Sequence, residues 1–404
     1  MAHTNGTATD YKGLLDNLRR FVAGYGIAGT PAYTGTGNGT MTGVDCHPAT
    51  LTETWTVTCT TAVQDGGVFS VVGSASGAKA DATVGTPYDN GFIAFTINDG
   101  STDFVVDDVF TADVTQGAMS AASMAWLEKR WTTGDQNELV LQGPGDDGQQ
   151  QILVGIQTYY NVASDYYNWK LQGYTGYQSD ALFDAQPGAI PVASFTPPKL
   201  ALWNAEMPYW LTADGSHIVL SVKVSTVYES MYLGFADAMG TPGQYPYPLV
   251  IAGSTTGYTS ERWSSQAYDV GSFNDPHEAY AGAGSPRRCP FLLRLPSGNW
   301  QPFYNWNAGS ANAVFNVWPY GRIAYMTPGA ASQRESLDGS VPLMALLLTD
   351  QTNHNVYGAL RTAFWMPGFG QSSENTISVG TDNYWVFQDT FRTGATNYWA
   401  MKQG

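Results

Sequence analysis

The sequence TVYESMYLGFADAMGTPGQYPYPLV, residues 226–250, joins the end of a strand to an unusually aromatic loop. The stretch IVLSVKVSTVY at 218–228, which overlaps its start, alternates apolar and polar side chains and predicts a β-strand. Thr-Pro-Gly at 241–243 predicts a turn, and the Tyr-Pro pairs at 245–248 favour a stiff, extended backbone. The rings of this loop must pack against something. The sequence allows two partners, the chain's own domain or a neighbouring subunit.

A subunit contact is the sharper hypothesis, because Tyr and Met are enriched where proteins meet. Under this hypothesis, six side chains of the loop and of the preceding strand are candidate interface residues: Tyr228, Met231, Tyr232, Phe235, Tyr245 and Tyr247.

The composition indicates a mainly β protein with many loops. A length of 404 residues predicts more than one folded unit, and a hydrophobic content of 43% is enough for sizeable cores. Charged residues make up only 13% of the chain. The net charge of −16, with no basic run longer than Arg287-Arg288, argues against binding to nucleic acid.

The cysteines and the N-terminus bear on the compartment. Cys46, Cys59 and Cys289 form no CxxC motif; Cys46 and Cys59 could pair, but free thiols in a reducing cytoplasm are the favoured interpretation. The start, MAHTNGTATDY, lacks the pattern of a signal peptide, and the longest apolar run, VPLMALLL at 341–348, is too short to span a bilayer. We expect synthesis in the cytoplasm and no membrane insertion.

One helix is predicted, DYKGLLDNLRRFVAG at residues 10–24. Asp10 can cap its first turn, apolar residues from Leu14 to Val22 recur at helical spacing, and Gly24 can end it. The apolar face is expected to dock on the main domain.

Residues 29–118 read as a separate small β-sandwich. Residues 29–41, rich in Thr, Gly and Asn, predict a linker, and four strands follow: ETWTVTCT, GVFSVVGS, GFIAFTIND and FVVDDVFTADVT. The sandwich would interrupt one β-rich main domain formed by residues 1–28 and 119–404, since surface loops tolerate insertions.

Two sets of segments resemble known proteins. ETWTVTC, DGGVFSVVGSASG and TDFVVDDVFT, in this order, are similar to an immunoglobulin-like sandwich module inserted into structural proteins of tailed bacteriophages. ELVLQGPG, VGIQTYYN, LWNAEMPYWLTADGSHIVLSVKVSTVYESMYLGF and YWVFQDTFRTG resemble virion structural proteins of tailed phages, and together the two resemblances span nearly the whole chain.

The resemblance implies a place in the virion, in the tail or baseplate, and a function in assembly rather than an enzyme. It implies a homo-oligomer of three or six copies with other virion structural proteins as partners, and a sandwich able to make weak contact with the host surface. It supplies no catalytic residues and no cofactor. A host-receptor or glycan-binding tail protein is the alternative, and a glycan hydrolase is less favoured.

The search for catalytic or metal motifs finds no Gly-x-Ser-x-Gly, no HExxH and no phosphate-binding loop, and the histidines are dispersed. We therefore assign no catalytic, cofactor or metal residues. Four carboxylates near the aromatic stretch could pair for glycoside hydrolysis: Glu206, Asp214, Glu229 and Asp237.

Three weaker patterns remain open. One acidic group could bind Ca²⁺, although a solvated acidic edge is favoured: Asp99, Asp103, Asp107 and Asp108. His277-Glu278 lies in a predicted surface loop and could bind a metal or a subunit. Three Tyr-Trp pairs could stack on sugars, but strand alternation should bury one member of each pair as a core or interface anchor: Tyr209-Trp210, Tyr384-Trp385 and Tyr398-Trp399.

Overall fold

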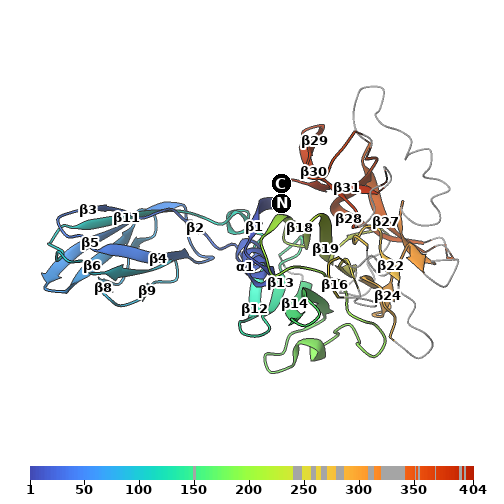
Figure 1. The fold of residues 1–404 in the computed structure, drawn as a ribbon, viewed down its shortest axis with the longest axis horizontal. Helices are drawn as coiled ribbons and strands as arrows, with labels where there is room; N and C mark the ends of the chain where they lie inside the picture. Colours follow the sequence, from blue (N-terminus) through green and yellow to red (C-terminus); the bar gives the residue numbers. More distant parts are fainter. Residues whose placement is uncertain are drawn as a thin grey trace. The chain divides into compact units, whose positions relative to one another are not determined.

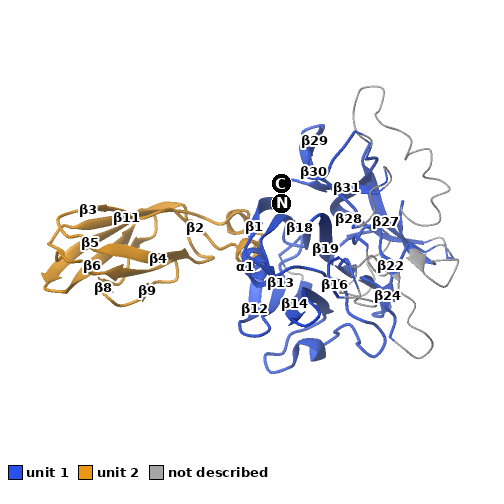
Figure 2. Cartoon of the chain, viewed as in Figure 1, with its two compact units in different colours: residues 1–19, 126–404 blue, residues 20–125 orange. Residues whose placement is uncertain are grey.

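The computed structural model describes most of the chain (Figure 1). It covers residues 1–148, 152–239, 248–255, 261–264, 271–278, 286–307, 314–319, 342–350, 352–353, 355–368, 370–390, 394 and 397–404, with residues 278, 306 and 307 described by their backbone alone. Strands dominate these residues, which confirms the prediction of a mainly β fold. Two compact units are present (Figure 2): unit 1 is residues 1–19 with 126–404, and unit 2 is residues 20–125.

Unit 2 is a sandwich of two antiparallel sheets. One sheet has the order β2-β11-β5-β6-β7, with β3 paired to β11 and β8 paired to β6; the other has the order β4-β10-β9. The strands are β2 (Ile27–Ala28), β3 (Ala32–Thr34), β4 (Thr40–Cys46), β5 (Glu53–Val63), β6 (Gly66–Gly73), β7 (Gly77–Ala78), β8 (Ala82–Thr83), β9 (Tyr88–Asp89), β10 (Ile93–Asn98) and β11 (Val109–Thr115).

The sandwich core forms because alternate side chains of these strands point between the sheets. Burial alternates along β6, β10 and β11, as the sequence predicts. Five aromatic side chains at the centre are almost fully buried: Trp55, Phe69, Phe95, Phe104 and Phe110. The Phe69 and Phe104 rings meet edge to face with centroids 5.0 Å apart, a favourable aromatic geometry.

The predicted linker at 29–41 is wrong in part, because its middle is a strand. β3 pairs with β11, and the Tyr33 ring lies 4.7 Å from that of Phe110. A single aromatic side chain in a polar stretch gives enough apolar surface to hold the backbone on the sheet.

The boundaries of unit 2 differ from the predicted 29 and 118. β2 extends the sandwich sheet before residue 29, with Val114 opposite Ala28 and Thr115 opposite Ile27. After the last strand, Ser120 in helix α2 (Ala118–Ala121) donates from its hydroxyl to the carbonyl of Gly24 at 2.9 Å. The chain therefore enters and leaves unit 2 through adjacent segments.

Helix α1 (Tyr11–Val22) begins and ends as predicted. Asp10 Oδ1 accepts from the backbone N–H groups of Lys12 and Gly13 at 2.8 and 2.7 Å, which is an N-cap. Gly24, at φ +76, donates to the carbonyl of Phe21, and the next residue donates to the carbonyl of Arg20, so a Schellman motif closes the helix.

Replacing Asp10 with alanine should destabilise unit 1 by about 1 kcal/mol, because two N-terminal amides lose their acceptor. Urea unfolding measures this change. Asp135→Ala is the matched control, since Asp135 is exposed and carries the same charge. Equal midpoints for the two variants would contradict the capping role.

The described residues of unit 1 form three large antiparallel sheets. The first has the order β1 (Ala2–Ala8), β17 (Met207–Ala213), β18 (His217–Val224), β19 (Val227–Phe235), β21 (Leu249–Ala252), β23 (Phe291–Arg294), β24 (Trp300–Pro302). The second has the order β12 (Leu127–Thr132), β13 (Glu138–Gly143), β14 (Ile152–Asn161), β15 (Tyr166–Tyr174), β16 (Lys199–Leu200). The third has the order β26 (Phe315–Trp318), β27 (Met344–Asp350), β28 (Asn355–Met366), β31 (Tyr398–Lys402), β30 (Asp382–Gln388), β29 (Thr376–Val379), with β20 (Asp237–Ala238) paired to β28.

The sheet that holds β17, β18 and β19 is the middle layer. One of its faces shares a core with the third sheet, in which Tyr232 packs with Phe273 and Trp399. Its other face contacts the second sheet where β14 and β16 meet β19 and where β15 meets β21. Because both faces are covered, β18 and β19 are buried almost continuously, although the sequence of β18 alternates.

The smaller elements complete the unit. β22 (His277–Glu278) and β25 (Trp306–Asn307) form a short parallel pair, and Phe183–Ala185 is a single 3-10 turn. All three cysteines are buried and none of them forms a disulfide. No helix within the described part of the chain has the length and apolar character needed to cross a membrane.

Candidate functional site

The predicted interface residues of β19 belong to the chain's own core. Met231 and Tyr232 are 0% exposed and Phe235 is 4% exposed. The interface prediction is wrong for these three, because the sheets on both sides of β19 already cover them. Tyr228 is half-buried and its hydroxyl donates to Glu374 Oε1 at 2.6 Å, so its interface role stays a prediction. The last two members, Tyr245 and Tyr247, lie outside the described residues.

The three Tyr-Trp pairs are core residues rather than sugar platforms. Alternation was expected to bury one member of each, but all six side chains are at most 8% exposed: Tyr209, Trp210, Tyr384, Trp385, Tyr398 and Trp399. The reason is that the strands carrying them have packing partners on both faces.

The four candidate carboxylates do not form one pair. Glu206 is exposed, and Glu229 is buried in β19. Asp237 pairs with Arg361, a residue that the sequence did not single out, and Asp214 is linked to the same guanidinium through the Ser216 hydroxyl. No sequence pattern indicates this grouping, because Arg361 is far from these carboxylates along the chain and lies on a strand of the third sheet.

We call Arg361, Asp146, Asp214, Ser216 and Asp237 the Arg361 cluster. The guanidinium donates from Nη1 and Nη2 to the two carboxylate oxygens of Asp146 at 2.6 and 2.8 Å, and its Nε lies 2.7 Å from Asp237 Oδ1. Nη1 also donates to the hydroxyl of Ser216. Burial alone would lower the pKa of Arg361, but these carboxylates raise it, so the cation is fixed.

Asp214 forms the turn between β17 and β18. Its Oδ1 accepts from the Ser216 hydroxyl at 2.7 Å and from the backbone N–H groups of Ser216 and His217 at 2.8 and 3.0 Å. The imidazole Nδ1 of His217 lies 2.9 Å from the same oxygen. Burial favours the neutral acid, but these partners hold the pKa of Asp214 well below its usual range. The arrangement therefore presents an ionised carboxylate to a buried histidine.

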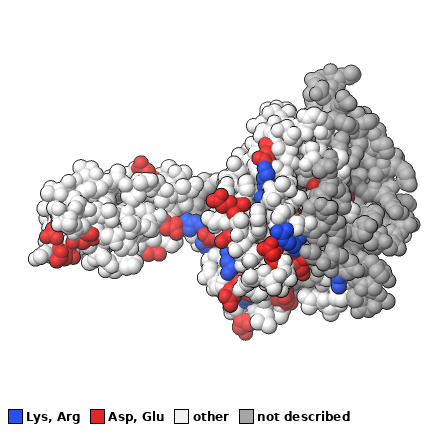
Figure 3. Space-filling model, in the orientation of Figure 1, with Lys and Arg blue, Asp and Glu red and all other residues white. Residues whose placement is uncertain are grey.

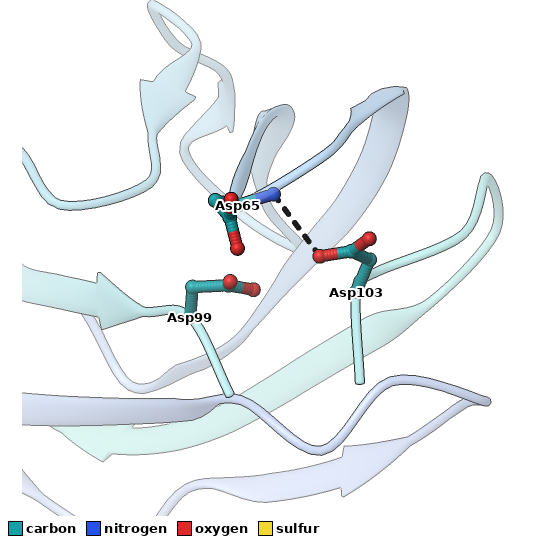
Figure 4. A group of neighbouring side chains, drawn as sticks. All are labelled: Asp65, Asp99 and Asp103. Carbon is teal, nitrogen blue, oxygen red and sulfur yellow. Dashed lines mark hydrogen bonds between the residues drawn. The ribbon is translucent and has the colours of Figure 1, made fainter. Parts of the chain in front are cut away.

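The acidic residues of unit 2 divide into two groups. Asp65, Asp99 and Asp103 face one another at the loop ends (Figure 4), with carboxylate oxygens within 4.8 Å of one another and the Asp65 N–H donating to Asp103 Oδ1 at 3.0 Å. Such oxygens are of the kind that bind Ca²⁺. Asp65 and Asp103 are exposed, so a solvated acidic edge remains the favoured interpretation. The sequence analysis did not include Asp65, because Asp65 lies in the turn between β5 and β6 and not in the acidic stretch from Asp99 to Asp108.

Asp108 is not part of that edge, which corrects the grouping. It is 1% exposed and accepts four hydrogen bonds, from the hydroxyl of Tyr33 and the backbone N–H groups of Thr36, Gly37 and Val105, at 2.8, 2.8, 3.1 and 3.0 Å. Burial would raise the pKa of Asp108, but these donors lower it. Its carboxylate therefore anchors the 34–38 loop.

Replacing Asp108 with asparagine should loosen this loop by about 2 kcal/mol, because an amide cannot accept all four bonds. Hydrogen exchange at the Thr36 and Gly37 amides should accelerate by about 30-fold. The control is Asp107→Asn: Asp107 is exposed at φ +75, which asparagine tolerates, so exchange should not change. Equal exchange in both variants would contradict the anchoring role.

His277 is buried rather than on a surface loop, which corrects that expectation. Its Nε2 lies 3.7 Å from Asp275 Oδ2, and Asn305 Nδ2 donates to Asp275 Oδ1 at 3.0 Å. The carboxylate of Asp275 thus links the segment of β22 to that before β25. We therefore interpret the His277–Asp275 contact as one that holds these two segments together.

Comparisons with known proteins give no further identification. A scan against models of protein families finds no match, and a search of the curated proteins finds no match either.

Proposed function

We propose that this chain is a structural component of a tailed-phage virion, in the tail or baseplate, that acts by assembling with copies of itself and with other virion structural proteins. The resemblance of its sequence segments supports the class of protein. The observation that carries the proposal is the insertion of a separately packed sandwich into a β-rich body.

The two units have separate cores. The aromatic core of unit 2 is built from its own strands, and the cores of unit 1 are built from the three large sheets. Because β2 and β11 pair, the segments by which the chain enters and leaves the sandwich lie side by side. A sandwich attached in this way can make a weak host-surface contact while the body remains packed in the particle.

The composition of the surface also suits permanent assembly. Figure 3 shows that most of the described surface on this face carries no charged side chain, although acidic side chains gather at one end of unit 2, and charged residues are only 13% of the chain. Cores of protein interfaces are depleted in charge. We propose three or six copies per assembly, synthesis in the host cytoplasm, which suits buried cysteines without disulfides, and final localisation in the tail.

The test is quantitative mass spectrometry and electron cryomicroscopy of particles purified from the virus that encodes the chain. We expect the chain in the tail or baseplate, in a copy number that is a multiple of three. Particles that lack the chain would overturn the proposal. A virus whose chain has residues 29–112 replaced by a short Gly-Ser linker should still form particles, and a change confined to host adsorption would assign the contact to unit 2.

A further inference from the structure

We propose that Thr362 is a nucleophile for acyl transfer from a neutral carboxylic ester, activated by His217 and oriented through Asp214. This activity goes beyond the structural role proposed above and does not depend on it. The three side chains form a continuous relay in unit 1. His217 Nδ1 lies 2.9 Å from Asp214 Oδ1, and His217 Nε2 lies 2.9 Å from Thr362 Oγ1.

The relay has the proton arrangement that nucleophilic catalysis needs. An ionised carboxylate can only accept, so His217 Nδ1 carries the proton that it shares with Asp214. In the neutral imidazole, His217 Nε2 is then the nitrogen with a lone pair, and in this tautomer it accepts from the Thr362 hydroxyl 2.9 Å away. A hydroxyl, a base and an orienting carboxylate in this order are recognised by geometry and not by sequence position.

The base is held in a fixed orientation. The His217 side chain is fully buried, and its ring stacks on that of Tyr232 with centroids 5.6 Å apart and an angle of 16°. The hydroxyl of Tyr232 is itself fixed, because it donates to the carbonyl of Phe235 at 2.6 Å and accepts from the backbone N–H of Arg361 at 3.3 Å. Little reorganisation is therefore required when the base takes a proton.

The backbone of Thr362 is strained. Its φ is +60, which is rare for a β-branched residue. It lies in an irregular part of β28, where Ala345 pairs with Phe364 but Leu347 pairs with Ala359. Irregularities of this kind re-aim side chains and recur beside active sites, as does backbone strain. Here the irregularity directs the hydroxyl at His217.

The surroundings of the hydroxyl select the substrate class. Thr362 is half-buried, whereas the His217 side chain is fully buried, so of the two residues Thr362 is the one nearer solvent. The adjacent Arg361 pairs with the carboxylates of Asp146 and Asp237, and the carboxylate of Asp214 is linked to it through the Ser216 hydroxyl. This excess of negative charge disfavours phosphates and carboxylates, which leaves a neutral ester as the acyl donor.

The reaction balances with water as the only co-reactant. Thr362 Oγ1 attacks the carbonyl carbon of the ester, and its proton moves to His217 Nε2. The bond to the alkoxy oxygen breaks, and the alkoxide takes that proton and leaves as an alcohol. Water then attacks the acyl-threonine and gives a proton to His217 Nε2, which returns it to Thr362 Oγ1 as the carboxylic acid departs.

The test uses p-nitrophenyl acetate as the ester and a fluorophosphonate as the covalent probe. We expect the full chain to hydrolyse the ester and to form one adduct, located at Thr362 by peptide mass mapping. Thr362→Val keeps the β-branched shape but removes the hydroxyl, so hydrolysis should fall by about 100-fold or more and the adduct should disappear. Thr362→Ser should retain both.

The controls separate catalysis from structure. His217→Gln should abolish the adduct while Thr362 is still present, and circular dichroism should show that each variant is folded. A relay that only stabilises β28 would change the unfolding temperature of the Thr362→Val variant without any covalent adduct in the original protein. Hydrolysis by the original protein no faster than by folded Thr362→Val, with no adduct at Thr362, would overturn the proposal.

Discussion

Replacing Glu229 with glutamine is expected to stabilise the protein strongly at pH 8 and to leave its stability at pH 5 nearly unchanged. Glu229 lies in the middle layer at 0% exposure, and neither of its carboxylate oxygens has a hydrogen-bond partner among the described residues. Burial raises the pKa of Glu229 to about 8, although the nearby Ser254 opposes the rise. The side chain is therefore an uncompensated buried acid.

The sign follows from proton linkage. Between its ordinary value of 4.5 and about 8, Glu229 holds a proton in the folded chain but not in the unfolded chain. The folded state binds more protons in this range, so stability falls as pH rises through it and then levels off. The interval between the two pKa values corresponds to a loss on the order of 5 kcal/mol. Glutamine does not titrate, so this loss disappears.

Urea unfolding at pH 5 and pH 8 measures the effect. The unfolding midpoints of the original protein and of Glu229→Gln should agree at pH 5 and separate at pH 8. Glu206→Gln is the matched control, because Glu206 is exposed and its removal should leave the pH dependence unchanged. If the original protein and Glu229→Gln lost the same stability between pH 5 and pH 8, Glu229 would not be the group that causes the pH dependence.

Replacing Gly234 with alanine should destabilise unit 1 by about 4 kcal/mol. Gly234 lies opposite His217 in the β18–β19 pair at φ +119, a conformation that L side chains rarely adopt. A Cβ there would lie 2.3 Å from the carbonyl oxygen of Ser216 and 2.7 Å from the Cα of His217. Both are backbone atoms, so neither can move aside cheaply.

Gly380→Ala separates the two causes. Gly380 also has a positive φ, +63, but a Cβ there meets nothing within 4 Å, so its substitution should cost only about 1 kcal/mol of backbone strain. The difference between the two variants in urea unfolding measures the overlap with the β18 backbone. Equal destabilisation would show that strain alone requires glycine at position 234.

Local patterns in the sequence were sufficient for the local structure. Asp10 and Gly24 set the ends of α1 through contacts within a few residues, and alternation placed the sandwich strands. The layering of unit 1 was not predictable in the same way. Tyr232 follows the alternating stretch 218–228, and a sheet formed by distant segments covers it, so a ring expected at an interface is in the core.

The candidate sites show the same limit. Asp108 looked like one member of an acidic run, but its donors come from the loop around Thr36, which is far away in the sequence. Thr362 belongs to no motif, and only folding brings its hydroxyl to His217 from a strand of another sheet. Such constellations depend on long-range contacts, which residue spacing does not encode.

The pairing of β2 with β11 also has an evolutionary consequence. Ala28 and Val114 are opposite each other in an antiparallel pair, where Cα atoms are roughly 5 Å apart. Excision of the intervening segment would leave two ends that a short turn can join at a small entropic cost. A recombination event at these two positions would therefore replace or remove the sandwich without changing the three large sheets of unit 1.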